Sequence, residues 1–151
     1  MSYPSRRMLV AATLPCLVPL RPAKAFMLVS PEEVALSAAA PMPALTRSIV
    51  VGGPRIEVDS PDGTLSPGQA IAFRLRFVPA QDATIDPATF RAFYGSLGID
   101  ITGRIRPHAR IDAQGVVAEN VSVPAGQHRV VLSIADSQGR AGRREVRFSV
   151  N

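Results

Sequence analysis

Apolar and polar residues alternate along much of the chain after residue 54, and a period of two predicts β-strands with one buried face. The clearest case is AIAFRLRFV at 70–78, where large apolar residues are separated by alanine or arginine. Turn-forming residues crowd the preceding segment, DSPDGTLSPG, at 59–68. We therefore expect a strand at 70–78 that follows a long turn.

Shorter stretches with the same alternation predict further strands at 55–60, 90–95, 98–106, 127–136 and 144–150, and a pair of strands within 109–123 around a turn at 113–115. The segment 127–136 is apolar on both faces, so we place it at the centre of a sheet. Asp86 and Pro87 favour the start of one helical turn in the loop before 90–95.

These elements predict an all-β fold with no strong helix. Seven or eight short strands, separated by turn signals at regular intervals, are typical of an antiparallel β-sandwich of about 100 residues. We place this domain at 55–151.

Three stretches of this domain carry a resemblance: RIEVDSPDGTLSPGQAIAFRLRF at 55–77, TIDPATFRAFYG at 84–95, and PAGQHRVVLSIADSQGRAGRREVRFSV at 124–150. Together they resemble a bacterial immunoglobulin-like domain. The antibody hallmarks are missing, because 55–151 has no cysteine or tryptophan and Tyr94 comes too early for a tyrosine corner. The resemblance implies an immunoglobulin-like β-sandwich that acts as a module and not as an enzyme.

Residues 26–54 are rich in proline and alanine and predict a linker that includes a short helix. Ser30 has the character of an N-cap, Pro31 suits the first helical position, and Glu33 completes a capping box. Pro41 and Pro43 would end the helix.

The first 25 residues have the features of an export signal. Arg6 and Arg7 precede an apolar run at 8–20, which is shorter than the 20 or so residues that a membrane span needs. Ala23-Lys24-Ala25 fits the small-x-small rule for cleavage, so we expect cleavage after Ala25 and a periplasmic or secreted protein. Both the general and the twin-arginine export routes remain open.

Removing this leader changes the charge of the chain. The formal net charge is +5, but four of the 17 basic residues lie in the leader, and the remaining 13 nearly balance the 12 acids. The basic character that would suggest nucleic-acid binding therefore disappears. The one cysteine, Cys16, is lost as well, so the exported chain has neither a thiol nor a disulfide.

Two groups of residues are candidates for binding. Four arginines concentrate near the last predicted hairpin and could hold an acidic partner: Arg140, Arg143, Arg144 and Arg147. The two histidines, His108 and His128, are weak candidates for a metal site, although two histidines alone do not complete one. We expect His108 to be exposed and His128 to lie near the rim of the sandwich, bonded to the backbone. We predict no cofactor.

Two functions from different classes follow. The first is an exported, non-catalytic immunoglobulin-like module that binds a protein or envelope component through an edge strand or the arginine-rich face. The second is a periplasmic carrier of a small ligand or metal. An enzyme is disfavoured, because the exported chain lacks cysteine and lysine, and Gly95-Ser96-Leu97-Gly98 has the wrong spacing for a hydrolase nucleophile.

Overall fold

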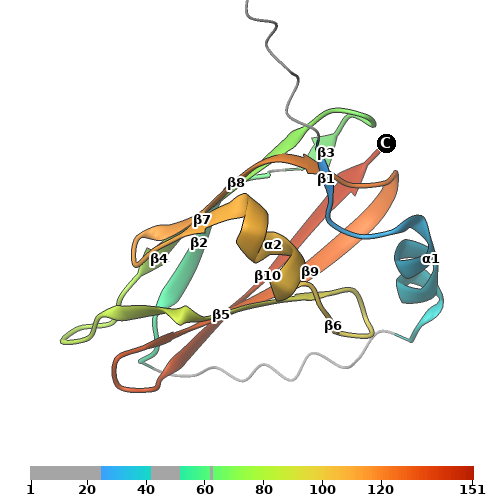
Figure 1. The fold of residues 1–151 in the computed structure, drawn as a ribbon. Coiled ribbons are helices and arrows are strands. Elements are labelled where there is room, and N and C mark those ends of the chain that lie inside the picture. Colours follow the sequence, from blue (N-terminus) through green and yellow to red (C-terminus); the bar gives the residue numbers. More distant parts are fainter. Residues whose placement is uncertain (1–24, 42–51, 62) are drawn as a thin grey trace, which may run out of the picture.

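The computed structural model describes residues 25–41, 52–61 and 63–151 (Figure 1). Residues 1–24 of the leader predicted at 1–25, and the linker segment 42–51, lie outside the described residues. The described chain forms two five-stranded sheets that pack face to face. The expected all-β sandwich is confirmed.

The first sheet, sheet A, has the order β1-β8-β4-β2, and β7 also pairs with β8. Its strands are β1 (Phe26–Met27), β2 (Arg55–Ser60), β4 (Ile71–Val78), β7 (Ala109–Ile111) and β8 (Gly115–Ser122). The predicted strand pair within 109–123 is confirmed as β7 and β8, which pair in antiparallel fashion.

The second sheet, sheet B, has the order β3-β10-β9-β5-β6. Its strands are β3 (Thr64–Leu65), β5 (Ile85–Tyr94), β6 (Ile99–Asp100), β9 (Gly126–Asp136) and β10 (Ala141–Val150). The prediction that 127–136 is a central strand is confirmed, because β9 lies between β10 and β5. The strands beyond the expected eight are the two-residue β1 and β3, and these make the two parallel pairings.

The core lies between the sheets and is built from the inward half of each alternating pattern. Ile71, Leu75 and Phe77 are buried on β4, and Val146, Phe148 and Val150 are buried on β10. Burying one such side chain contributes roughly 1.5–3 kcal/mol. The alternation therefore accounts for which face of each strand points inward.

The predicted helical turn at Asp86 and Pro87 is wrong, because both residues belong to β5. The strand is irregular there, with a register shift between Asp86 and Arg91. The Asp86 carboxylate accepts a hydrogen bond from the Ala88 amide at 3.0 Å, and Thr89 bridges the Asp86 carbonyl and the Ala135 amide. These bonds give the polar residues backbone partners inside a strand.

The predicted strand at 98–106 is also wrong beyond its first residues. After β6, the chain forms the helix α2 (Thr102–Ile105) and the short helix η1 (Arg106–His108). Ile101 and Ile105 lie four residues apart, so one helical turn buries both as well as a strand would. The Asp100 side chain accepts a hydrogen bond from the Thr102 amide at 2.8 Å and favours this turn.

Residues 26–29, which we assigned to the linker, pack in the sandwich. Phe26 and Met27 pair with β8, and Leu28 and Val29 are 3% and 1% exposed. The predicted short helix is confirmed as α1 (Pro31–Ala39), with the full capping box between Ser30 and Glu33. The apolar sequence FMLV explains the docking, since exposing it to water would be costly.

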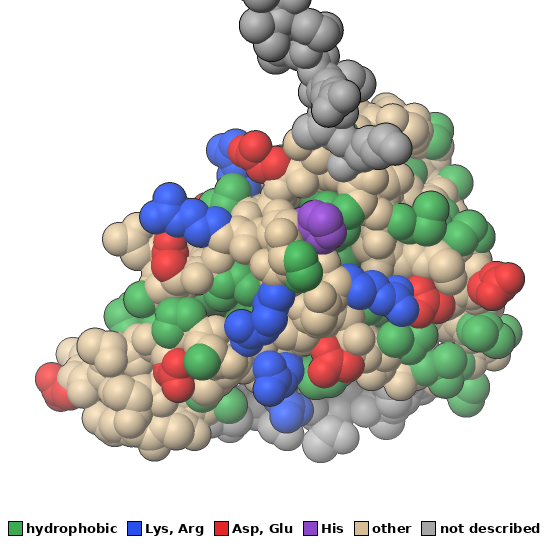
Figure 2. Space-filling model, viewed as in Figure 1, with side chains coloured by type: hydrophobic (Ala, Val, Ile, Leu, Met, Phe, Trp, Pro, Cys, Tyr) green, Lys and Arg blue, Asp and Glu red, His purple; other side chains and the backbone are tan. Residues whose placement is uncertain are grey.

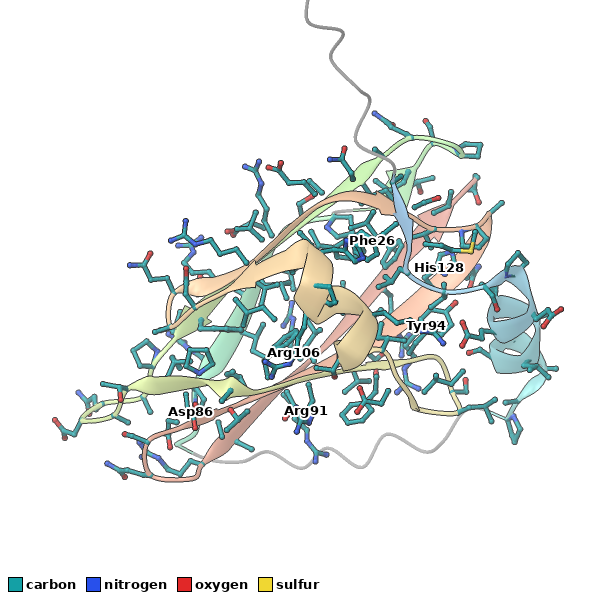
Figure 3. All side chains as sticks on the ribbon, viewed as in Figure 1. Phe26, Asp86, Arg91, Tyr94, Arg106 and His128 are labelled. Atoms are coloured by element: carbon teal, nitrogen blue, oxygen red, sulfur yellow. The ribbon has the colours of Figure 1, made fainter. Side chains whose placement is uncertain are left out.

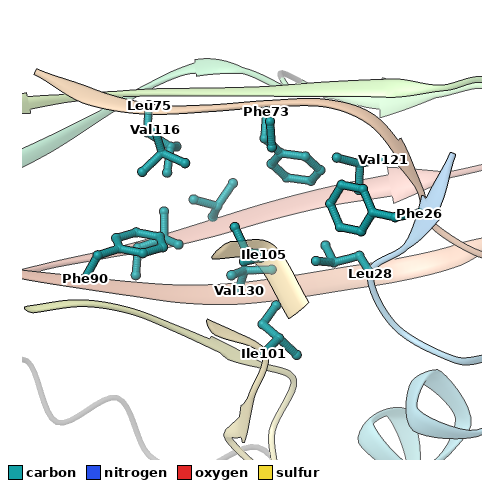
Figure 4. Close-up of a pocket in the computed structure, with 13 residues that line it drawn as sticks. Phe26, Leu28, Phe73, Leu75, Phe90, Ile101, Ile105, Val116, Val121 and Val130 are labelled. Carbon is teal, nitrogen blue, oxygen red and sulfur yellow. The ribbon is translucent and has the colours of Figure 1, made fainter. Parts of the chain in front are cut away.

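A small apolar cavity of about 30 Å³ lies between the sheets, beneath β1 and α2 (Figure 4). Phe26, Ile101 and Ile105 border it from the side that these elements cover. A space of this size and character has no room for a ligand. The interior of the sandwich therefore serves packing, and a binding site has to be sought on its surface.

Candidate functional site

The outer face of sheet B carries two adjoining hollows where β9 and β10 run side by side. The larger, of about 670 Å³, lies between the end of α1 and the strands, and the smaller, of about 230 Å³, lies further along β9. Both are bordered by Arg129, with Arg147 at the larger hollow and Arg143 at the smaller one. We call this surface, formed by Arg129, Arg143, Glu145 and Arg147, the arginine groove.

Strand alternation places these side chains together. Val146 and Phe148 point into the core, so Arg143, Glu145 and Arg147 point outward from β10. The antiparallel register sets Arg147 directly opposite Arg129 and sets Arg143 opposite Ser133. Arg147 lies four positions after Arg143, which is a rise of about 13 Å along the strand.

One carboxylate links the two facing arginines. Arg129 Nη2 donates to Glu145 Oε2 at 2.8 Å, and Arg147 Nε donates to Glu145 Oε1. These hydrogen bonds hold the pKa of the Glu145 carboxyl below its usual value, and the bond from Arg129 contributes most. Glu145 thus relieves the repulsion between two guanidinium groups that the register brings face to face.

The groove still has an excess of positive charge. Arg143 forms no ion pair with any carboxylate in the described part of the chain, and three arginines face one glutamate. Arg91 extends the row across the sheet, because β5 sets it opposite Ser133, on the other side from Arg143. Arg129 Nε is buried and lacks an acceptor among the described residues.

The helix α1 forms one wall of the larger hollow. Its Ser37 hydroxyl accepts a hydrogen bond from the Ser96 amide at 3.0 Å, which ties the helix to the loop after β5. Gly95 lies beneath this contact with a φ of 70°, and a Cβ there would come within 2.0 Å of Ser37 Oγ. A glycine is therefore required for α1 to approach the sheet.

Two of the four predicted arginines, Arg143 and Arg147, lie together in the groove. Arg140 lies instead in the β9–β10 turn, where its Nε donates to the buried Asp136 carboxylate at 2.8 Å. Burial alone would raise the pKa of Asp136, but hydrogen bonds from the Arg140 and Gln138 amides and from the Arg140 guanidinium outweigh it and lower the pKa. Arg140 stabilises the turn.

Arg144 belongs to the inward-pointing set of β10 but is exposed, and the structure does not bring it to the groove. Sequence reasoning missed Arg129 and Arg91, which come from the neighbouring strands β9 and β5. The sequence does indicate that each of these arginines faces outward from its own strand. Only the register between the strands shows which arginines lie side by side.

His128 is buried at 3% exposure, so its expected position near the rim is wrong. Its Nε2 donates to the Pro124 carbonyl at 2.8 Å, which confirms the expected backbone bond. Its Nδ1 then accepts from the Tyr94 hydroxyl at 2.8 Å (Figure 3). Its ring stacks on Phe148. Burial lowers the pKa of His128 and raises that of Tyr94 to about 12.

His108 is exposed, as expected, and stacks on Phe26 with ring centroids 4.3 Å apart. The two histidines thus have separate partners, Phe26 for one and Tyr94 for the other. Within residues 25–41, 52–61 and 63–151, no three histidine, cysteine, aspartate or glutamate side chains are grouped so that they could hold a metal ion.

The face that carries α2 offers a weaker candidate. Arg106 there donates to the carbonyls of Ala88 and Phe90 at 2.9 and 3.4 Å, and so covers the edge of β5 (Figure 3). Basic and acidic side chains are interspersed over this face (Figure 2). It presents no field of one sign that would attract a charged partner.

No family model and no curated protein matches the chain. A solved structure described as "Structures of Clostridium thermocellum CbhA fibronectin(III)-like modules" is similar with a TM-score of 0.45 and 15% identity. The match covers 67% of this chain and 48% of that chain, so it spans about half the length of that chain.

No helix within residues 25–41, 52–61 and 63–151 is long and apolar enough to cross a bilayer.

Proposed function

We propose that this protein is an exported, non-catalytic β-sandwich module that binds a protein or envelope component through the arginine groove. The observation that carries the proposal is the grouping of Arg129, Arg143 and Arg147 around the single carboxylate of Glu145. Arginine is well suited to recognise acidic groups, because its planar guanidinium offers several donors in a fixed arrangement.

Edge protection accounts for Arg143 and Arg147 on β10, which pairs with β3 only at Ser149 and Val150, but it does not account for Arg129. Charged residues often guard the edge strands of a sheet against pairing with other chains. Arg129 lies on β9, which is central and hydrogen-bonded to strands on both sides. An arginine at that position gives no protection to an edge, so a role in binding is the better account.

The non-catalytic part of the proposal is supported by how the reactive side chains are used. Both ring nitrogens of His128 are engaged, one by Pro124 and the other by Tyr94. The Tyr94 hydroxyl is buried, and its raised pKa keeps it protonated near neutral pH. Both groups are thus committed to hydrogen bonds within the fold, which favours a structural role for them.

Photo-crosslinking in the native host tests the groove as a binding surface. A photoreactive amino acid replaces Ser133, which lies between Arg91 and Arg143 on the outer face of sheet B. The matched control replaces Glu119, an exposed residue of sheet A. We expect a discrete adduct from position 133 that disappears when Arg143 and Arg147 are both changed to glutamine. Adducts from position 119 alone would contradict the proposal.

Export is tested separately, by intact mass of the protein recovered from the periplasm. We propose a leader at 1–25, and the expected mass is that of Phe26 to Asn151 without modification. An uncleaved chain would contradict export by this signal.

A further inference from the structure

We infer that the partner presents an extended acidic segment of polypeptide, whose carboxylates bind along the arginine groove. This inference rests on the proposed function and adds the chemistry of the ligand.

Glu145 shows which chemical group the groove accepts. Its two oxygens each take one hydrogen bond, from Arg129 and from Arg147, so a carboxylate already lies between these guanidiniums. Each arginine keeps further N–H donors that these bonds do not use. A second carboxylate from a partner would find donors of the same kind, and Arg143 has no competing acid within the described chain.

The spacing of the arginines favours an extended ligand. Arg143 and Arg147 lie about 13 Å apart along β10, which is the rise of four residues in a strand. A peptide in extended conformation with acids at positions i and i+4 matches this distance.

The rest of the surface suits a peptide as well. The hydroxyls of Thr64 and Ser149 and the amide of Gln127 line the larger hollow, where they can bond to backbone groups of a ligand. Phe93 and Val131 line the smaller hollow and are half-buried. This apolar floor would accept the apolar residue that lies between the two acids.

The test uses the full chain and a labelled seven-residue peptide with glutamate at its second and sixth positions and leucine at its fourth. A matched peptide carries glutamine in place of both glutamates. Binding is measured by fluorescence anisotropy for the native protein, for the R143Q/R147Q double variant and for R74Q/R76Q, a control that removes the same charge from sheet A.

We expect the acidic peptide to bind, the glutamine peptide to bind weakly or not at all, and R143Q/R147Q to weaken binding roughly two- to thirtyfold, the range for two exposed ion pairs. R74Q/R76Q should have no effect. E145Q should tighten binding, because it frees Arg129 and Arg147 for the ligand. A purely structural role for these arginines predicts no such gain.

Two further probes separate the ligand class from the proposed function: heparin, and vesicles of phosphatidylglycerol and phosphatidylcholine. Binding of either through Arg143 and Arg147, with no binding of the acidic peptide, would overturn the inference and leave the groove as a binding surface. If no probe depends on these arginines and position 133 gives no crosslink, both the inference and the proposed function are overturned.

Discussion

The pair Tyr94 and His128 shows how the fold fixes the state of one residue. Because Nε2 of His128 donates to the Pro124 carbonyl, Nδ1 has to accept from the Tyr94 hydroxyl, and the ring is neutral. A protonated ring would carry hydrogen on both nitrogens and lose this acceptor. The buried site therefore disfavours the charged form, in agreement with the lowered pKa of His128.

This linkage predicts how stability depends on pH. The pKa of His128 is lower in the folded state than the value of about 6.5 in the unfolded chain, so the unfolded chain binds the proton more tightly. The contribution of His128 is fully present above pH 6.5 and is lost as the pH falls below it. We expect the urea midpoint to drop between pH 7.5 and pH 5.5.

The variant H128Q should lose this part of the pH dependence even if it is less stable overall, because glutamine does not titrate. H108Q, which changes the exposed histidine, should keep it. If the urea midpoint of H128Q fell with pH as steeply as that of the native protein, the pH dependence would not come from His128.

At the scale of elements, the helix α1 is attached to the sandwich through its first turn. Glu33 accepts a hydrogen bond from the Ser30 amide at 2.8 Å and receives both terminal nitrogens of Arg104 at 2.7 Å. Arg104 also donates to the Leu28 carbonyl. The Glu33 carboxylate thus caps the N-terminus of α1 and also joins this helix to α2.

Changing Glu33 should therefore release the helix. The hydrogen bond from Arg104, followed by that from Ser30, lowers the pKa of Glu33 to about 2. The stabilisation is present above pH 4.5, the ordinary value, and is lost as the pH falls toward 2. At neutral pH we expect E33Q to cost roughly 1 kcal/mol in urea unfolding, the range for a lost cap or a favourable charge at a helix N-terminus.

The control for this variant is E32Q, which changes the neighbouring exposed acid. It should leave the urea midpoint nearly unchanged. Equal effects of the two variants would show that the charge of the first turn matters and the bond to Arg104 does not.

The elements also show where sequence reasoning succeeds. The capping box of α1 and the strands β2, β4, β9 and β10 depend on local patterns, and the sequence predicts all of them. The helix α2 was missed because Ile101 and Ile105 fit both a strand and a helical turn. The groove was half predicted, since Arg143 and Arg147 share one strand while Arg129 joins them only through strand pairing.

For the whole molecule, the alternation of apolar and polar residues predicts the fold class. It does not predict which residues before 55 pack in the sandwich. Phe26 to Val29 complete sheet A and the core, although they lie far along the chain from β8, with which they pair. Leu28 donates its amide to the Ser122 carbonyl at 3.0 Å. A pairing over such a distance leaves no local pattern in the sequence.

Phe26 should therefore be important for stability although it lies next to the predicted cleavage site. F26A removes the ring that stacks on His108 and borders the central cavity. Because the side chain is only half-buried, we expect a loss of about 2 kcal/mol, at the low end for a core substitution. The matched control is M27A, since Met27 is 58% exposed. Equal urea midpoints for the two variants would contradict the docking of β1.

The docking of β1 also has a consequence for maturation. A protease cuts a bond only when the chain around it is free to extend into its cleft, and paired strands resist this. The bond after Ala25 immediately precedes a residue that is paired with β8. For the leader that we propose, folding of the precursor and cleavage after Ala25 would be competing events, because a precursor that folded first would shield this bond. Transport as an unfolded chain, with cleavage before β1 docks, would avoid this conflict.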